Sequence, residues 1–132
     1  MLKGRFAVTT NRAMEFVDVT ALLQREITKS KVTEGVCYLY NPHTTAGLTI
    51  NEGADPDVCT DLVAALRLLV PDIPYRHMEG NSPAHLLTTL AGSSVTVFVE
   101  NGKLALGTWQ KIFFCEFDGP RSRKLCWRLM PA

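Results

Sequence analysis

Hydrophobic and polar residues alternate along several stretches of the chain, which is the pattern of strands that bury one face. In the run VTVFV at 95–99 the three valines share one side, and Thr96 and Phe98 share the other. The dipeptide Asn101-Gly102 follows closely and favours a type I′ turn, because both of its residues tolerate positive φ. The alternation predicts strands over 2–10, 14–17, 35–40, 47–51, 95–99, 108–117 and 123–130.

Three other segments repeat apolar residues every three to four positions, as amphipathic helices do. Each begins at a residue whose side-chain oxygen can cap a helix, namely Asp18, Asp55 and Ser82. Proline follows the second and third of these caps and suits the first helical position, where its missing N–H has no partner to lose. Pro71 ends the second segment. The pattern predicts helices over 19–31, 56–70 and 82–91.

The order of these elements indicates the fold class. No linker, repeat or low-complexity run interrupts the 132 residues, so we interpret residues 1–132 as one domain. Strands joined by short turns in the last third imply an antiparallel sheet, and with three helices the class is α+β. The second helix is expected to bury an apolar stripe made of Val58, Leu62, Ala65, Leu66 and Leu69.

Composition and charge exclude several classes of partner. The chain is 46% hydrophobic and 20% charged, with a net charge of +1, so no basic excess indicates nucleic acid. We interpret the short basic run at 121–124 as a solvated strand end. The most apolar stretch, 62–70, is interrupted by Arg67 and is too short to cross a bilayer. The N-terminus lacks the apolar core of a signal peptide, so we expect neither a nucleic-acid partner nor a membrane.

The cysteines indicate a compartment rather than a reaction. Cys37, Cys59, Cys115 and Cys126 form no C-x-x-C pair and fall within predicted strands and a predicted helix. Thiols in such positions are typically small buried residues that stay reduced. We therefore expect a cytoplasmic protein in which cysteine binds no metal.

Candidate chemistry centres on three histidines that lie in or beside turns. His43, His77 and His85 are separated by 34 and 8 residues. Three imidazoles with an open fourth position make a catalytic site of the zinc type. With Ser82 as the cap, His85 is the third helical residue, where the helix dipole disfavours a protonated ring and leaves it able to bind a metal. The spacing matches no established metal motif, so three unrelated loop histidines are the alternative.

Polar residues near the histidines extend this hypothesis. Glu79 lies two residues after His77 and is a candidate general base, a residue that orients a metal ligand, or a solvated loop carboxylate. The backbone N–H groups at 80–82 start a helix and can bind an anion. Glu52 and Asp57 can hold Mg²⁺ together with a phosphate, or only complement a helix N-terminus. The candidate substrate- or anion-binding residues are Asn51, Glu52, Gly80, Asn81, Ser82, Gln110 and Arg121.

Three longer motifs carry a resemblance to a known family. HTTAGLTINEGADPDV, HMEGNSPAHL and LALGTWQKIFFCEFDGPR occur in this order across residues 43–121. With these motifs the sequence resembles the YjbQ-like uncharacterised protein family over nearly the whole chain. Only the tail KLCWRLMPA is not typical of the family, and it holds none of the candidate polar residues.

The resemblance implies both a structure and an activity. The implied structure is a β-sandwich or barrel-like core with about three helices, assembled as a homotrimer. His43, His77 and His85 match a metal site in a pocket that can lie between subunits. The implied activity is secondary thiamine-phosphate synthase, which joins hydroxymethylpyrimidine diphosphate to thiazole phosphate and releases pyrophosphate. It is regarded as a side activity, so the physiological substrate stays open.

The implied chemistry leaves alternatives. Loss of pyrophosphate from carbon needs a metal and N–H donors to neutralise the leaving group. Mg²⁺ with oxygen ligands is usual for that task, whereas three imidazoles favour zinc. We therefore expect a divalent metal, zinc first, and Mg²⁺ with a phosphorylated substrate. Metal-dependent hydrolysis of a small phosphorylated or amide substrate also fits these ligands, with Glu79 as the base. A non-catalytic trimeric module that binds a metal or a small anion is the third hypothesis.

Overall fold

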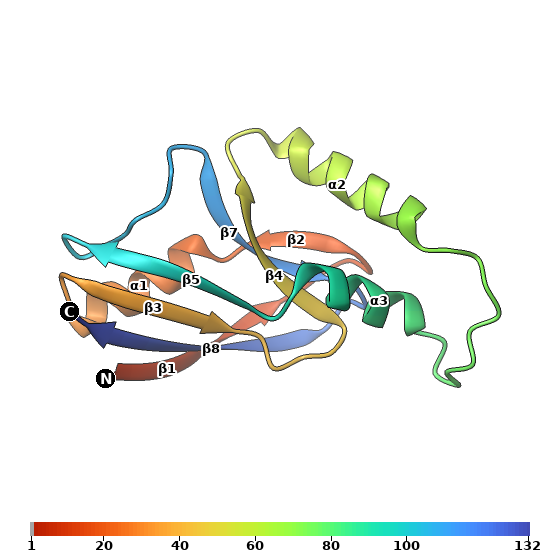
Figure 1. Ribbon diagram of the computed structural model, residues 1–132, viewed down its shortest axis with the longest axis horizontal. Coiled ribbons are helices and arrows are strands. Elements are labelled where there is room, and N and C mark those ends of the chain that lie inside the picture. The colour runs from red at the N-terminus through yellow and green to blue at the C-terminus, as the bar shows by residue number, and fades with distance from the viewer. Residues whose placement is uncertain (1) are drawn as a thin grey trace.

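The computed structural model describes residues 2–132, which form two antiparallel β-sheets and three helices (Figure 1). The five-stranded sheet has the order β1-β8-β3-β5-β6, and the three-stranded sheet has the order β2-β7-β4. The strands are β1 (Leu2–Thr9), β2 (Glu15–Asp18), β3 (Gly35–Tyr40), β4 (Ala46–Glu52), β5 (Ser94–Glu100), β6 (Lys103–Leu104), β7 (Gln110–Glu116) and β8 (Ser122–Pro131). The helices are α1 (Thr20–Ser30), α2 (Pro56–Leu69) and α3 (Ser82–Ala91).

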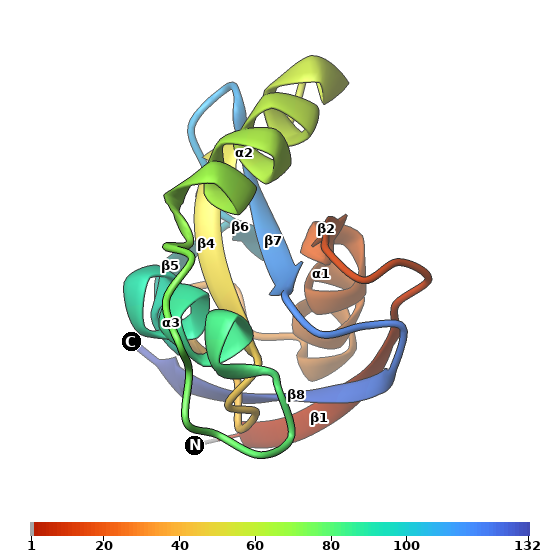
Figure 2. The same ribbon diagram turned by 90° about the vertical axis from the view of Figure 1, so that its right-hand side faces the viewer.

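The two sheets curve around one core and form a half-barrel (Figure 2). Inward and outward residues alternate along β8, where Leu125 and Leu129 are buried while Lys124 and Arg128 are exposed. α1 packs against β1, β6 and β7 and adds Leu23 to the same core. The predicted α+β class, with a largely antiparallel barrel-like core and three helices, is therefore confirmed.

The strand pairing differs from the prediction in one respect. Among residues 2–132, only β5 and β6 are paired consecutive strands, and Asn101 and Gly102 between them have φ of +52° and +76°. The other pairs join distant segments, such as β1 and β8, where Leu2 lies opposite Leu129. In the last third of the chain, the expected hairpin forms between β5 and β6, but β7 and β8 do not form one, because the turn between them carries the chain from one sheet to the other.

The first two helices begin close to the predicted residues. Asp55 caps α2 by accepting a hydrogen bond from Asp57 N at 2.9 Å, as predicted. α1 begins at Thr20, one residue later than expected, so Val19 instead of Asp18 occupies its cap position, and Asp18 Oδ1 accepts a bond from Thr20 N at 2.9 Å. Within residues 2–132, no helix combines the length and the apolarity needed to cross a bilayer.

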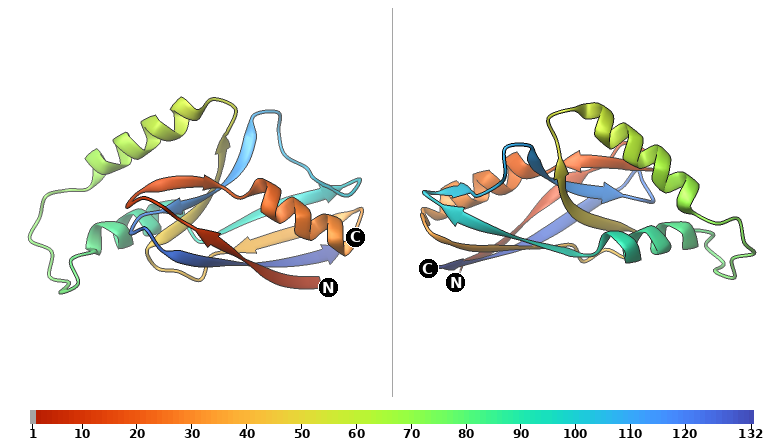
Figure 3. Two further views of the ribbon diagram at one scale, coloured as in Figure 1. Left: turned by 180° about the vertical axis from the view of Figure 1, so that it is seen from behind. Right: turned by 45° about the horizontal axis from the view of Figure 1, so that its top comes forward.

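The buried stripe predicted for α2 is wrong. No residue of α2 is buried: Val58, Leu62 and Leu66 are half-buried, and Ala65 and Leu69 are exposed. α2 lies along the margin of the molecule and packs against β2 instead of covering a sheet face (Figures 1 and 3). The apolar periodicity is present, but the described chain offers α2 too little surface to bury it.

Candidate functional site

The three histidines line one pocket of about 460 Å³, where the β3–β4 loop, the start of α3 and the start of β8 meet. His43 and His85 are 42 residues apart in the sequence, yet both line this pocket together with the candidate base Glu79. The histidines are therefore not three unrelated loop residues. The lining residues are Pro42, His43, Thr44, Thr45, His77, Glu79, Asn81, His85, Arg121 and Arg123.

His43 is held by the backbone of β8. β3 ends at Tyr40, opposite Cys126, and the same register would place residue 42 opposite Lys124. The His43 ring occupies this open position, with Nε2 at 3.0 Å from both the backbone N and the backbone O of Lys124. Nε2 is therefore committed to β8, and Nδ1 is the nitrogen that remains for a ligand.

The environment keeps the His43 ring neutral. Burial lowers the pKa of His43, and the positive charge of Arg123 lowers it further. The bond to the Lys124 backbone and the charge of Glu116 act in the opposite direction without reversing the shift. A neutral imidazole has one nitrogen free to accept a proton or to bind a metal.

A turn and the first turn of α3 bring His77 and His85 together. His77 O accepts a hydrogen bond from Gly80 N at 3.2 Å, and Gly80 has φ of +77°. α3 begins at Ser82, so Asn81 occupies the cap position that was predicted for Ser82, and His85 is the fourth helical residue instead of the third. The two imidazole rings lie edge to face, with centroids 5.5 Å apart.

This pair fits part of a metal site. Two imidazoles on one tetrahedral zinc, at the usual Zn–N distance, have ring centroids about 5 Å apart. The 5.5 Å between the rings of His77 and His85 is close to that value. Within residues 2–132, however, no group of three or more His, Cys, Asp or Glu is placed to hold an ion. In the described chain, the match to a metal site therefore rests on the spacing of these two rings, without a third donor in position.

A buried ion pair forms the floor of the pocket. Glu116 is fully buried and Arg123 is 5% exposed. Arg123 donates from Nε to Glu116 Oε1 at 2.9 Å and from Nη2 to Glu116 Oε2. Thr10 Oγ1 donates to the same carboxylate at 2.8 Å, and so does Asp118 N at 3.0 Å. Burial acts to raise the pKa of Glu116, but these hydrogen bonds lower it more, so the carboxylate is ionised.

Asp118 connects the turn after β7 to the start of α3. Its Oδ2 accepts from Asn81 Nδ2 at 3.1 Å and from Arg121 Nη2 at 2.9 Å. Burial acts to raise the pKa of Asp118, and the bonds from Asn81 and Arg121 lower it further than burial raises it. The Asn81 side chain thus fixes α3 to the β7–β8 turn instead of capping its own helix.

The charges around the pocket largely cancel. Arg123 is paired with Glu116, and Arg121 is paired with Asp118. Glu79 adds a third carboxylate. The two guanidiniums and three carboxylates sum to −1. The side chains alone therefore do not favour a multiply charged anion.

The other candidate residues lie in two places. Gly80 and Ser82 are adjacent in sequence to pocket residues but do not line the pocket. Asn51, Glu52 and Gln110 lie at the far ends of β4 and β7, where Glu52 is opposite Gln110. The structure thus separates these three residues from the histidines.

Sequence reasoning missed two residues of the pocket floor. Thr45 was not selected, and Arg123 was assigned to a solvated strand end, yet both are buried. The sequence did contain a signal that Arg123 is buried. Arg123 lies on the same side of β8 as Leu125, Trp127 and Leu129, which face the core. An arginine on the buried face of a strand indicates a buried partner.

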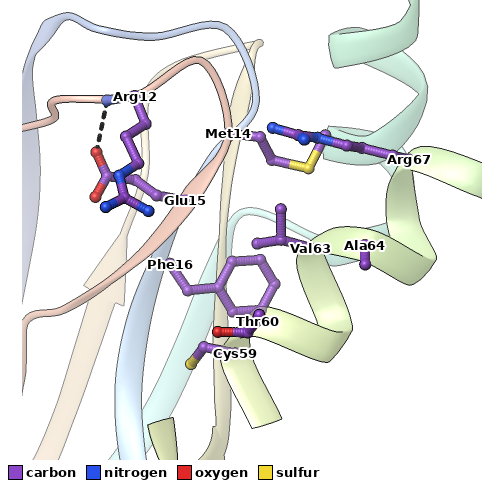
Figure 4. Close-up of a pocket in the computed structure, with 9 residues that line it drawn as sticks. All are labelled: Arg12, Met14, Glu15, Phe16, Cys59, Thr60, Val63, Ala64 and Arg67. Atoms are coloured by element: carbon purple, nitrogen blue, oxygen red, sulfur yellow. Dashed lines mark hydrogen bonds between the residues drawn. The ribbon is translucent and has the colours of Figure 1, made fainter. Parts of the chain in front are cut away.

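A second cavity of about 380 Å³ lies between β2 and α2. Phe16 and Val63 face each other across it, and Arg12 and Arg67 lie on opposite rims (Figure 4). None of the three histidines lines it. It lacks the combination of imidazoles and a carboxylate that makes the histidine pocket the candidate site.

Comparisons with known proteins agree over almost the whole chain. The profile of the family described as UPF0047 protein YjbQ-like matches residues 4–132. A UPF0047 protein of Methanocaldococcus jannaschii is 48% identical over 91% of this chain and 88% of its own length. UPF0047 protein YugU of Bacillus subtilis is 47% identical over 98% of this chain and 99% of its own.

Solved structures show the same fold. A hypothetical protein from Aeropyrum pernix superposes with a TM-score of 0.93 at 37% identity, covering all of both chains. A YjbQ/UPF0047 family protein from Clostridium acetobutylicum gives a TM-score of 0.91 at 46% identity, covering 96% of this chain and 98% of that one. The curved sheets and the three helices are therefore shared with these relatives.

Proposed function

The chain belongs to the YjbQ-like UPF0047 family, and from this premise we propose that it is a metal-dependent enzyme acting on a small phosphorylated substrate in the histidine pocket. One observation carries the proposal. The rings of His77 and His85 have centroids 5.5 Å apart, close to the spacing of two imidazoles on one ion, and their pocket also holds His43, whose pKa is lowered, and the carboxylate of Glu79. Imidazole ligands favour zinc, with Mg²⁺ the alternative when a phosphate supplies oxygen ligands.

The charge of the pocket supports the need for a metal. Its guanidiniums are already neutralised by Glu116 and Asp118, so they add little net attraction for a phosphate. A divalent ion on His77 and His85 would turn the local sum of −1 into +1. When bound, such an ion acts as a Lewis acid toward a phosphoryl oxygen.

The chain's own residues have separate tasks in this proposal. Glu79 lies at the exposed rim and, in a hydrolytic reaction, takes the proton of the attacking water. Arg121, whose Nε and Nη2 are held by Asp118, orients the substrate near that rim. His43 supplies Nδ1 as a further donor or acceptor, because its Nε2 is held by Lys124.

The proposed reaction is transfer between phosphorylated substrates, with thiamine-phosphate synthesis as a secondary activity. It would join hydroxymethylpyrimidine diphosphate to thiazole phosphate and release pyrophosphate. The second candidate is hydrolysis of a small phosphorylated or amide substrate, which the imidazole ligands and Glu79 favour because zinc sites of this kind suit hydrolysis. A trimeric module that only binds a metal or an anion would not need Glu79.

We further propose that the protein is a cytoplasmic homotrimer. All four cysteines are free thiols, which suits a reducing compartment. Leu68 is 87% exposed and Leu69 62% exposed on α2, and Phe98 is 60% exposed on the outer face of the five-stranded sheet. Contacts between copies would cover these side chains. Light scattering coupled to size exclusion tests this, and a monomer mass at micromolar concentration contradicts it.

Metal content and turnover test the enzyme proposal. Untagged protein purified without chelator should hold zinc, and His77→Ala should lose it, while the control Glu52→Ala, outside the pocket, should keep it. Zinc below about a tenth of an ion per chain, unchanged in His77→Ala, contradicts the metal site.

Glu79 separates an enzyme from a binding module. Glu79→Gln should keep the metal but abolish hydrolysis of a small phosphorylated substrate, because the amide cannot accept the proton of the attacking water. The same rate in Glu79→Gln and in wild type would remove Glu79 as the base. Glu52→Gln serves as the matched control, since it changes the same functional group outside the pocket.

A further inference from the structure

Arg123 and Thr45 are almost completely buried and yet line the histidine pocket. Arg123 is 5% exposed and Thr45 is 8% exposed. Arg123 Nη2 donates to Thr45 Oγ1 at 2.9 Å and also to Glu116, which accepts a second bond from Nε. The guanidinium is therefore fixed on one side by a carboxylate and on another by a hydroxyl that borders the pocket.

These bonds leave two donors unused. Thr45 Oγ1 accepts from Arg123, and its own O–H donates to no acceptor within residues 2–132. Arg123 Nη1 also has no hydrogen-bond partner in this part of the chain. A hydroxyl that accepts a bond from a guanidinium is polarised toward donating its proton. Because both residues line the pocket, one ligand oxygen can accept from both.

We propose that Arg123 Nη1 and the Thr45 hydroxyl form an oxyanion subsite that binds one phosphate oxygen of the substrate. The inference rests on the proposed function, because it names the part of the pocket that receives the phosphorylated group. Glu116 holds the guanidinium in place before any ligand arrives, so little reorganisation accompanies binding. Donors arranged in this way stabilise a single oxygen with high negative charge more than they stabilise a neutral group.

The neutral net charge of the Arg123–Glu116 ion pair determines which ligand group the subsite can bind. Glu116 offsets the charge of Arg123, so the subsite offers directed donors without a net positive charge. It therefore suits one oxygen of a phosphate whose remaining charge is met elsewhere. A divalent ion held by His77 and His85, which line the same pocket, would meet that remaining charge.

Thr45→Val removes the hydroxyl donor and leaves the Arg123–Glu116 pair intact. Binding of inorganic pyrophosphate is measured by titration calorimetry, with and without equimolar zinc. Thr45→Val should bind at least about tenfold more weakly than wild type, because a hydrogen bond to a charged group is lost. Thr45→Ser keeps the donor and should restore affinity. Thr49→Val, in the adjoining strand β4 but outside this pocket, is the matched control and should bind like wild type.

A second measurement reads Arg123 directly. Its Nε–H is bonded to a buried carboxylate, so its NMR resonance should be protected from exchange and visible. The resonance should shift when pyrophosphate or inorganic phosphate is added to wild-type protein. Acetate at the same concentration should leave it in place, and an equal shift with acetate would overturn the assignment to phosphate.

The outcomes separate this inference from the proposed enzyme. Equal pyrophosphate affinity in Thr45→Val and wild type overturns the subsite while the enzyme proposal stands. Weaker binding in Thr45→Val, in a protein that turns over no substrate, supports the subsite and removes the enzyme proposal. Wild-type protein that binds no pyrophosphate under either condition overturns the subsite.

Discussion

The two ends of β4 are both polar, but they use their polar side chains differently. At the first end, Thr45 immediately precedes the strand, and its Oγ1 accepts a hydrogen bond from Arg123, 78 residues away. At its end, Glu52 Oε2 accepts from Ala54 N at 2.8 Å and from Asp55 N at 3.0 Å, which are two and three residues away. The first end forms the floor of a pocket, and the second forms a turn that leads into α2.

The difference shows what makes a polar turn a candidate site. Near the second end, Asn51 Oδ1 accepts from Glu52 N at 2.8 Å, and Gln110 Oε1 accepts from Gly107 N at 2.8 Å. Such local bonds stabilise the path of the backbone. At the first end the partners come from different strands, so their side chains surround a common space. Polarity near a turn indicates a ligand site when distant segments supply the groups.

Breaking the ion pair at the first end should have the largest effect. Arg123→Ala leaves Glu116 buried without its partner, and we expect it to lower the free energy of unfolding by about 3–5 kcal/mol. Urea denaturation followed by circular dichroism measures this value. A loss below about 1 kcal/mol, typical of a surface pair, would contradict the burial of the network.

A double variant sharpens the test. Arg123→Met combined with Glu116→Leu removes both charges together, so the loss should be smaller than the sum of the two single losses. Additive losses would show that the two side chains stabilise the fold independently, which would contradict the hydrogen bonds between Arg123 and Glu116.

Acid should reduce the stabilisation that Glu116 and Asp118 supply near the histidine pocket. Burial acts to raise the pKa values of Glu116 and Asp118, but the bonds from Arg123 and Asn81 hold them below their ordinary values of 4.5 and 3.8. The folded state therefore binds fewer protons than the unfolded state, and this stabilisation is lost as the pH falls below those values. The free energy of unfolding, measured from neutral pH to roughly pH 3, should fall less steeply in the Arg123→Met, Glu116→Leu variant. Identical slopes would contradict the role of Glu116.

A change at the second end of β4, in the turn that leads into α2, should have the smallest effect on stability. Asp55→Ala removes the cap of α2, which we expect to cost about 1 kcal/mol because one exposed N–H loses its acceptor. The same urea denaturation measures it, with Asp55→Asn as the control that keeps a capping oxygen. Pyrophosphate affinity should not change. A tenfold loss of that affinity would show that the second end contributes to the ligand site after all.

Much of the fold could be predicted because its signals are local. β3 has the predicted bounds, and the turn at Asn101-Gly102 and the cap at Asp55 are as expected. Each depends on a residue and its near neighbours, through side-chain alternation, positive φ or a short hydrogen bond. The start of α3 was misplaced by one residue because Asn81 is used by Asp118, which lies 37 residues away.

The sequence by itself determined the strands and helices and drew attention to three histidines, a carboxylate and a helix start. Only the tertiary structure decided that the histidines share a pocket, that Asn51, Glu52 and Gln110 lie apart from them, and that Arg123 and Thr45 form the floor. It also decided that α2 leaves its apolar stripe only partly covered. The physical reason is the same throughout. Periodicity and capping arise within a few residues, whereas a pocket depends on how strands far apart in the chain pair, and the spacing of residues along the chain does not encode that pairing.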